Sequence, residues 1–356
     1  MLAARQVLCV VTALALGTSV ATLAQSPAAT KAYPWDLRPK KCLLEQARMT
    51  PSCREPESWI DFVESVRRIQ ILLADPDSEL LERAAAEVAL TEARFDTGQY
   101  LFEAWYLATR SQLATPDPQT TKYIEQWSSN RAASSPALLT QALALFGEAW
   151  SVRGQGVAAT VSPEAWMLFN QKLQLADSTL ESAAQNLKNS GPWHLLKVQI
   201  SFDSSEMRGR RLDILDKAAS AWPDSTMLYE APMSRSQPKW GGSFALMDGI
   251  ARLAANKAKT RTSASMYALV YERAFRGNSQ YSLRESDIDW KMAKRGFQEL
   301  QSAGTNPNWL WKNFAQLACQ MRDRDEARRL YQLNDSLNRI AESNTPDACR
   351  VFAASN

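Results

Sequence analysis

The sequence predicts an all-α protein made of stacked helical hairpins, a degenerate α-solenoid, over residues 56–356. Apolar residues recur three and four positions apart through most of this region, which is the spacing of one helix face. Short turns that contain Gly or Pro, among them SGPW, WPDS and NPNW, each precede a new helical pattern. No segment predicts a β-strand convincingly. The intervals between turns are unequal, so we expect an irregular stack.

Residues 308–333 show the hairpin pattern most clearly. The pattern consists of Trp311, Phe314, Ala315, Ala318, Ala327 and Tyr331. Their order, W-x2-F-A-x2-A followed by A-x3-Y, resembles the tetratricopeptide repeat. Ala315 and Ala318 replace the Gly and Tyr of that repeat, and no Pro closes the unit. The alternative is an ordinary helical hairpin in a non-repeating bundle.

Residues 1–24 predict a secretory signal peptide. Arg5 precedes an apolar run over residues 7–16, and small residues follow before Gln25. The run is too short to cross a bilayer, which needs about 20 apolar residues. A retained membrane anchor is the alternative. No later segment is apolar enough to span, so we expect a periplasmic or secreted protein without a membrane span after cleavage.

Residues 25–55 predict an N-terminal extension that holds a disulfide. The cysteines beyond the signal peptide are Cys42, Cys53, Cys319 and Cys349. Their even number favours disulfides in an oxidising compartment. Three pairings are possible, and Cys42–Cys53 with Cys319–Cys349 is favoured because each pair is nearest in sequence. A zinc site would lack CxxC spacing and has one histidine to draw on, so we expect no metal and no cofactor.

Helical spacing continues from one element to the next along the chain. In the first half it predicts helices over residues 56–73, 78–94 and 100–110. Ser78 is a predicted N-cap, and Gly98 separates the second helix from the third. Residues 115–121, TPDPQTT, predict a loop.

The second half predicts a longer series of helices. They cover residues 136–152, 163–187, 193–202, 208–221, 244–257, 263–275 and 287–303, with a short helix ending near residue 232 and the hairpin at 308–333. Ser162 and Ser243 are predicted N-caps, and Gly154 stops the helix before it.

Four short motifs together resemble a known family. They are Ala149-Trp150-x-x-Arg153-Gly154-x-Gly156, Trp193-His194-x-Leu196, Trp240-Gly241-Gly242-Ser243 and the hairpin at 308–333. With Trp127 they resemble a bacterial family defined by domain of unknown function 4034, whose members are tetratricopeptide-like. The resemblance covers roughly residues 80–333 and implies a helical-repeat fold. The family has no assigned reaction, so no catalytic residues are implied.

Catalytic signals are weak in this sequence. His194 is the only histidine, and its place beside Trp193 at a helix start favours a structural role over that of a general base. The carboxylates Glu148, Glu164, Asp287 and Asp289 are candidates for an acid/base pair in a helical glycosidase. Solvated helix faces explain most of them equally well. We therefore assign no catalytic residue.

Tryptophans supply the main binding signal. There are twelve, and many fall near helix ends or turns. Packing between hairpins is the favoured explanation, and an aromatic-lined groove for a peptide or glycan is the other. The candidate partner-binding residues are Trp150, Arg153, Trp193, His194, Trp240 and Gly241.

The function hypothesis is an exported helical-repeat scaffold that binds a protein or peptide without catalysis. One rival is an envelope enzyme that acts on a glycan through a carboxylate pair. Another is a dedicated partner or immunity protein linked to secretion. The net charge of +3 gives no reason to expect a nucleic-acid partner, and the alternating charges of residues 322–329 predict surface ion pairs.

Overall fold

The structure, a computed structural model, describes residues 78–354 except 96, 114–117, 132, 155, 157, 276–282, 305–308 and 339–347, together with scattered positions between 62 and 73. The predicted signal peptide and the N-terminal extension with Cys42 and Cys53 lie outside the described residues. Their predictions stay open.

The described residues fold into helices, which confirms the all-α prediction. No strand occurs among them, and one isolated bridge joins Arg94 and Tyr100. The α-helices are α3 (Ser78–Leu90), α4 (Leu101–Leu113), α5 (Pro118–Asn130), α6 (Ser135–Arg153), α7 (Pro163–Leu187), α8 (Gly191–Asp203), α9 (Arg211–Ala221), α10 (Glu230–Arg235), α11 (Phe244–Lys257), α12 (Ser263–Phe275), α13 (Trp290–Ala303), α14 (Trp309–Gln320), α15 (Arg324–Asn338) and α16 (Ala348–Ala354). Short 3-10 turns are η2 (Ala158–Thr160), η3 (Thr226–Tyr229), η4 (Pro238–Trp240) and η5 (Leu283–Glu285).

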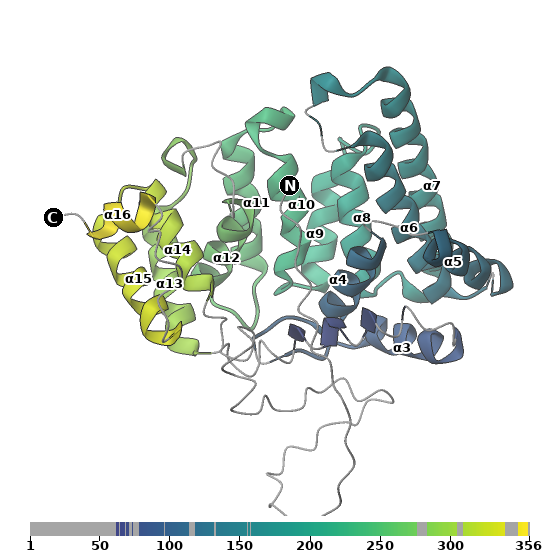
Figure 1. The fold of residues 1–356 in the computed structure, drawn as a ribbon, viewed down its shortest axis with the longest axis horizontal. Helices are drawn as coiled ribbons and strands as arrows, with labels where there is room; N and C mark the ends of the chain where they lie inside the picture. The colour runs from purple at the N-terminus through teal and green to yellow at the C-terminus, as the bar shows by residue number, and fades with distance from the viewer. Residues whose placement is uncertain are drawn as a thin grey trace, which may run out of the picture.

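The helices form two layers that alternate along the chain. In the even layer, α4 packs on α6, α6 on α8, and so on through α10, α12, α14 and α16. In the odd layer, α7, α9, α11, α13 and α15 each pack on the even helix before them. Figure 1 shows these helices side by side in chain order, from α6 and α7 at one end to α14–α16 at the other. This arrangement is the predicted stack of helical hairpins.

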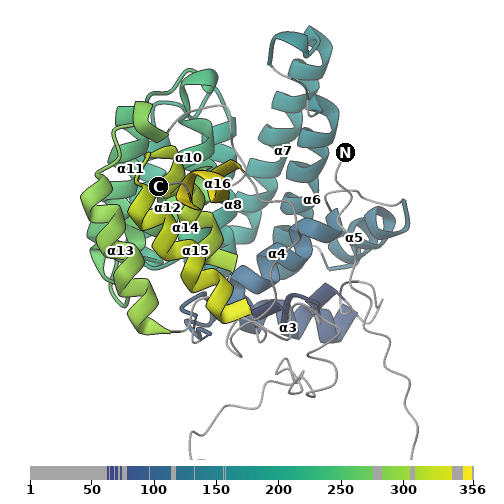
Figure 2. The ribbon, with the colours of Figure 1, turned by 60° about the vertical axis from the view of Figure 1, so that its left-hand side comes forward.

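The longest hairpin is α6 with α7, and Figure 2 shows it projecting beyond its neighbours at one end. The bounds of α7 match the predicted helix over residues 163–187. Ser162 caps it as predicted, because the Ala165 amide donates to the Ser162 hydroxyl at 3.2 Å.

The loop predicted over residues 115–121 is wrong in its second half. Helix α5 begins at Pro118, where a proline loses nothing because the first helical N–H has no helical acceptor. Serine, threonine and glutamine fill much of α5, so its helical pattern is faint in the sequence. Ile124 and Trp127, three residues apart, are buried, and the Trp127 indole donates to Glu82 of α3 at 3.0 Å. Tertiary burial therefore decides the structure of this segment.

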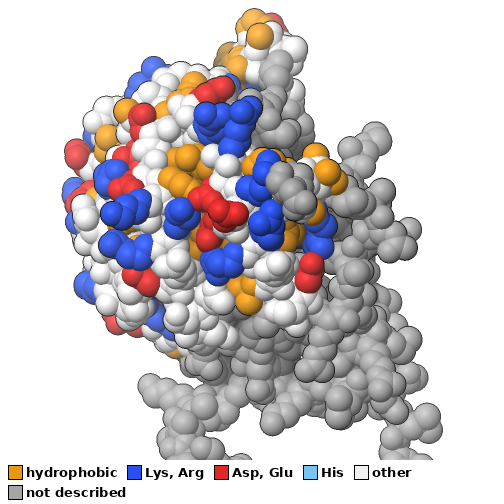
Figure 3. All heavy atoms as spheres, turned by 90° about the vertical axis from the view of Figure 1, so that its left-hand side faces the viewer, with side chains coloured by type: hydrophobic (Ala, Val, Ile, Leu, Met, Phe, Trp, Pro, Cys, Tyr) orange, Lys and Arg blue, Asp and Glu red, His pale blue; other side chains and the backbone are white. Residues whose placement is uncertain are grey.

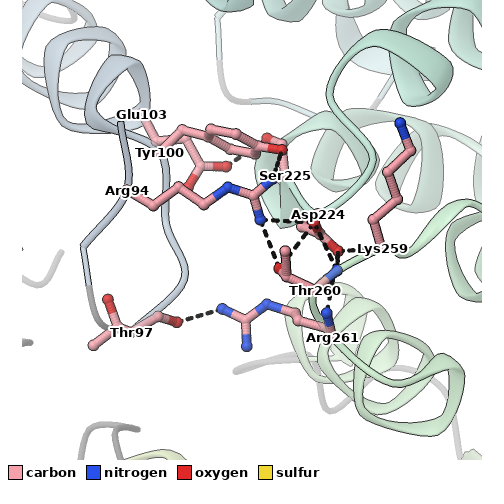
Figure 4. Close-up of polar contacts among 9 residues, drawn as sticks. All are labelled: Arg94, Thr97, Tyr100, Glu103, Asp224, Ser225, Lys259, Thr260 and Arg261. Carbon is pink, nitrogen blue, oxygen red and sulfur yellow. Dashed lines mark hydrogen bonds and ion pairs between the residues drawn. The ribbon is translucent and has the colours of Figure 1, made fainter. Parts of the chain in front are cut away.

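A polar cluster around Asp224 ties the chain before α4 to the middle of the stack (Figure 4). The Asp224 carboxylate is buried in the turn before η3. It accepts the backbone N–H of Lys259 at 2.9 Å and of Thr260 at 3.1 Å, both in the α11–α12 loop. Arg94 donates to the same carboxylate at 2.7 Å. Three segments far apart in sequence are thus held by one side chain.

Glu103 lies beside this cluster and is completely buried. Its Oε1 accepts the Ser225 hydroxyl, and its Oε2 has no hydrogen-bond donor among the described residues. Burial raises the pKa of the Glu103 carboxyl, and the Ser225 hydrogen bond opposes that rise. Each contact in this cluster joins two parts of the fold, so we assign the cluster a structural role.

The predicted disulfide Cys319–Cys349 is present, with its Cα atoms 5.7 Å apart. It joins α14 to α16. Further contacts hold α16 in place: Arg350 pairs with Asp335 of α15 at 2.8 Å, and Arg328 donates to the Ala353 carbonyl at 2.9 Å. The C-terminal helix is therefore fixed covalently at a position where chain ends otherwise fray.

Removing this disulfide is expected to destabilise the protein. The Cys319→Ser/Cys349→Ser variant should lose about 2–4 kcal/mol in the free energy of unfolding, because the crosslink limits the unfolded chain. Urea denaturation without reductant measures the loss. Addition of dithiothreitol to the same titration should lower the free energy of unfolding of the wild type more than that of the variant. An equal response of the two proteins to dithiothreitol would contradict this role.

Ion pairs cover the end of the molecule that carries α13–α16. Figure 3 shows basic and acidic side chains interspersed over this face. Within the segment of alternating charge, Arg328 pairs with Asp325 at 3.6 Å and Arg329 with Glu326 at 2.6 Å, as predicted. In the part of the chain that the structure describes, no helix is both long and apolar enough to cross a membrane.

Candidate functional site

Arginines gather where the helices of the even layer end. Four of these helices carry one in their last turn: Arg110 in α4, Arg153 in α6, Arg235 in α10 and Arg273 in α12. Cations are favoured there because the helix dipole is negative at its C-terminus. The layered fold brings the four turns to one edge, where all four arginines line a single cavity of about 560 Å³.

A second cavity of about 240 Å³ adjoins the first, between α6, α7 and the segment from α8 to α9. The two cavities share Trp150, Arg153, Asp203, Arg235 and Trp240. They therefore form one continuous depression, which we call the arginine groove.

Arg153 occupies the centre of the arginine groove. Its guanidinium carbon lies 5.3 Å from the ring centroids of Trp150, Trp166 and Trp240, within the range of cation–π attraction. Nη1 donates to the carbonyls of Gly154 at 3.0 Å and Gly156 at 2.7 Å. Arg153 is only 6% exposed, and its buried Nη2 has no acceptor among the described residues. The three indole rings are thus organised around one cation.

Asp203, at the end of α8, anchors one wall of the groove. Its buried carboxylate accepts Arg235 Nε at 2.5 Å and the Trp150 indole N–H at 3.0 Å. Arg235 also lies over the Trp150 ring, 4.3 Å from its centroid. Burial raises the pKa of the Asp203 carboxyl, and the charge of Arg235 opposes that rise. These contacts fix the positions of Trp150 and Arg235.

The other wall holds Glu230 between two arginines. Arg110 and Arg273 approach its two oxygens at 3.4 and 3.3 Å. The cationic residues that line the groove are Arg110, Arg153, Arg208, Arg211, Arg235, Lys239 and Arg273. Its acidic residues are Asp203 and Glu230. The groove is therefore strongly basic, although the whole chain is close to neutral.

Three of the predicted binding residues, Trp150, Arg153 and Trp240, come together in this groove. Gly241 follows Trp240 and adopts φ 77°, the left-handed conformation that glycine allows. A side chain on Gly242 would collide with the carbonyl of Ser236. Both glycines therefore complete the tight turn that places the Trp240 ring at the groove.

Trp193 and His194 lie elsewhere. They begin α8, whereas Asp203 ends it, and ten residues of helix put about 15 Å between the two ends. Trp193 is buried and donates its indole N–H to the Leu180 carbonyl of α7 at 3.1 Å. The His194 ring stacks edge-on against Trp193, with centroids 5.1 Å apart. These contacts join α7 to α8 and do not reach the arginine groove.

His194 makes the stability of the fold depend on pH. Burial lowers the pKa of its imidazole from 6.5 to about 4. The unfolded chain therefore binds the proton first, so stability is lost as the pH falls from about 6.5 to about 4. The expected loss is about 3 kcal/mol. Urea denaturation at pH 7 and pH 4 should show a smaller loss for His194→Gln than for the wild type, and equal losses would contradict the prediction.

Several groove residues were not predicted as a site. Trp166 lies in the first turn of α7. The long amphipathic pattern of that helix does not distinguish it from residues of the core. Arg110, Arg235 and Asp203 come from three different helices. One signal does exist in the sequence: four of the even-layer helices, α4, α6, α10 and α12, carry an arginine in their last turn. That signal becomes visible only once the helices are known to alternate in direction.

The carboxylates considered for glycosidase chemistry lie in three places: Glu148 in α6, Glu164 in α7, and Asp287 with Asp289 before α13. Glu148 pairs with Lys172 across α6 and α7, and Asp289 caps α13 by accepting the Met292 amide at 3.0 Å. Glu164 lies in the first turn of α7, and Asp287 is exposed before α13. None of the four lines the arginine groove.

Comparison with protein-family models, curated proteins and solved structures found no match to this chain. The resemblance to the family of domain of unknown function 4034 therefore rests on the four sequence motifs, and it stays a prediction.

Proposed function

We propose that this chain is an exported helical-repeat scaffold that binds a protein or peptide partner in the arginine groove without catalysis. The observation that carries the proposal is the convergence of three tryptophans and the terminal arginines of four helices on one depression. Export rests on the predicted signal peptide at residues 1–24.

The chemistry of the groove suits recognition of a polypeptide. Trp150, Trp166 and Trp240 are each partly exposed, so their rings offer apolar surface at the groove. Aromatic and arginine side chains dominate the binding energy of many protein interfaces. They are also held in place here by contacts within the fold, which lowers the entropy lost on binding.

Glycan hydrolysis is supported less well by the same groove. It contains two acids, Asp203 and Glu230, beside tryptophans. Asp203 is engaged by Arg235 and Trp150, and Glu230 by two arginines. A general acid must present its proton to the substrate. Both acids instead meet donors of their own fold, which favours a role in holding the groove.

The rival of a dedicated secretion partner has one supporting observation. Met167, Leu168 and Leu175 are exposed on α7, at 54%, 42% and 52% of their full accessibility. Exposed apolar patches on soluble proteins often mark contact sites. A partner held there would lose affinity in a Leu175→Ser variant and keep it in a Trp240→Ala variant.

The proposal is tested by selecting binders from a phage-displayed library of random dodecapeptides. We expect the recovered peptides to bind wild-type protein and to lose about tenfold or more in affinity with Trp240→Ala, measured by fluorescence anisotropy. Trp309→Ala is the matched control, since Trp309 is half-buried on α14 and lines neither cavity. Recovered peptides that bind Trp240→Ala as well as wild type would overturn the proposal.

A further inference from the structure

Two arginines at the mouth of the smaller cavity lack acidic partners. Arg208 precedes α9 and is exposed, and Arg211 is the first residue of that helix. Neither forms an ion pair among the described residues, and Arg211 instead lies 5.2 Å from the ring centroid of Phe202. Burial and the neighbouring charge of Arg208 lower the pKa of Arg211, as expected for cations held close together.

Arg153 and Arg235 extend this cluster into the groove. Arg153 is 6% exposed, and its Nη2 has no acceptor in the part of the chain that the structure describes. Arg235 donates from Nε to Asp203 at 2.5 Å and from Nη1 to the Ser234 hydroxyl at 3.4 Å, and it lines both cavities. In the smaller cavity Asp203 is the sole acid among four arginines. Positive charge therefore exceeds negative charge in this cavity, which raises its affinity for an anion.

We propose that the arginine groove binds an extended acidic peptide segment, with its carboxylates on Arg208, Arg211 and Arg235 and its apolar side chains against Trp166 and Trp240. This inference rests on the proposed function and specifies its partner. Guanidinium and carboxylate match in geometry and form paired hydrogen bonds. Indole rings between the cations supply the apolar contact that isolated surface arginines would lack.

The two acidic residues of the groove distinguish between an acidic peptide and a nucleic acid as the ligand. Asp203 and Glu230 stand along the same depression as the arginines. A nucleic acid carries a charge on every phosphate and would bring some of them against these two carboxylates. A peptide spaces its acids with neutral residues, so it can place them on the arginines and keep them away from Asp203 and Glu230. The pattern of charge therefore favours an acidic peptide over a nucleic acid.

The test compares three synthetic probes with the full chain by fluorescence anisotropy. The first is a labelled dodecapeptide in which glutamates are separated by leucine, serine and glycine. The second is the same peptide with every Glu replaced by Gln. The third is a single-stranded dodecathymidylate. We expect the acidic peptide to bind at least about tenfold more tightly than either of the others, because hydrogen bonds to charged groups are stronger than those between neutral groups.

Single substitutions then locate the contact. Arg208→Ala and Arg211→Ala should each weaken the acidic peptide by about tenfold, and the Gln peptide by less than about twofold. Arg210→Ala is the matched control: it removes the same charge two residues from Arg208, but Arg210 is exposed and lines neither cavity. It should leave affinity within about twofold.

The outcomes separate this inference from the proposed function. Equal binding of the Glu and Gln peptides, tighter binding of the oligonucleotide, or an equal loss with Arg210→Ala would each overturn the acidic-peptide inference. If the library still yields neutral peptides whose affinity depends on Trp240, the scaffold proposal stands and only the acidic-peptide inference is wrong. If neither the library nor the acidic peptide gives binding that depends on the groove, both are wrong.

Discussion

Asp224→Ala is expected to lower the free energy of unfolding by about 3–5 kcal/mol, the cost of breaking a buried charged pair and its hydrogen bonds. The substitution removes the acceptor for Arg94 and for the backbone N–H groups of Lys259 and Thr260 (Figure 4). The Asp224 side chain is fully buried, so its removal would leave the charged Arg94 without its acidic partner in the fold. Loss of the contact should also loosen the segment before α4.

The pH dependence of this contact follows from its pKa. Burial alone would raise the pKa of Asp224, but Arg94 and the N–H donors outweigh it and hold the pKa below the usual value. The stabilisation is therefore present at neutral pH and is lost as the pH falls through the lowered pKa. Urea denaturation at pH 7 measures the main effect. Asp287→Ala, at an exposed aspartate, is the control, and similar losses in both variants would contradict the assignment.

Two glycine substitutions should have opposite effects on stability. Gly296→Ala is expected to lower the free energy of unfolding by about 3 kcal/mol, since the new methyl group would overlap the Ala264 carbonyl and force α13 away from α12. Gly249→Ala, in the middle of α11, should raise stability by about 0.5–1 kcal/mol. At that position an added Cβ would meet no atom within 4 Å.

Thermal or urea denaturation of the two alanine variants checks the layered packing directly. Both changes add the same methyl group to a glycine inside a helix, so helix propensity cancels in the comparison. The difference between them should be about 4 kcal/mol. A Gly296→Ala variant that is as stable as Gly249→Ala would show that α12 and α13 do not approach as closely as the structure places them.

Much of the fold could be predicted from local signals. The bounds of α7, α11 and α12 agree with the predicted ranges. Ser243 caps α11 as expected, accepting the Leu246 amide at 3.1 Å. In each case a capping residue and a continuous apolar face point to the same helix, so local and tertiary preferences agree.

Elements without such agreement were missed or given the wrong end. Helix α5 has few apolar residues, and its identity depends on where Ile124 and Trp127 become buried. Helix α10 extends to Arg235, beyond the end expected near residue 232, and it packs against both α8 and α12. Contacts made by other parts of the chain decide both segments, and such contacts leave no local pattern.

The candidate site could be predicted only in part for the same reason. Trp150 and Arg153 share one motif and Trp240 begins another, so their residue types drew attention in the sequence. Asp203 and Arg235 have common residue types in ordinary helices. Their importance comes from the alternation of layers, which sets the ends of α6, α8 and α10 beside one another.

The central claim is that partners bind where the helices of the even layer end. It is tested most directly by photo-crosslinking a groove-selected peptide that carries a benzophenone residue, followed by mass spectrometry of the attached sites. We predict attachment at the segments that line the groove, which are the C-terminal turns of α4, α6, α8, α10 and α12, the first turns of α7 and α9, and the turn at Trp240. Attachment concentrated on α11, α13 or α15, in the odd layer, would contradict the claim.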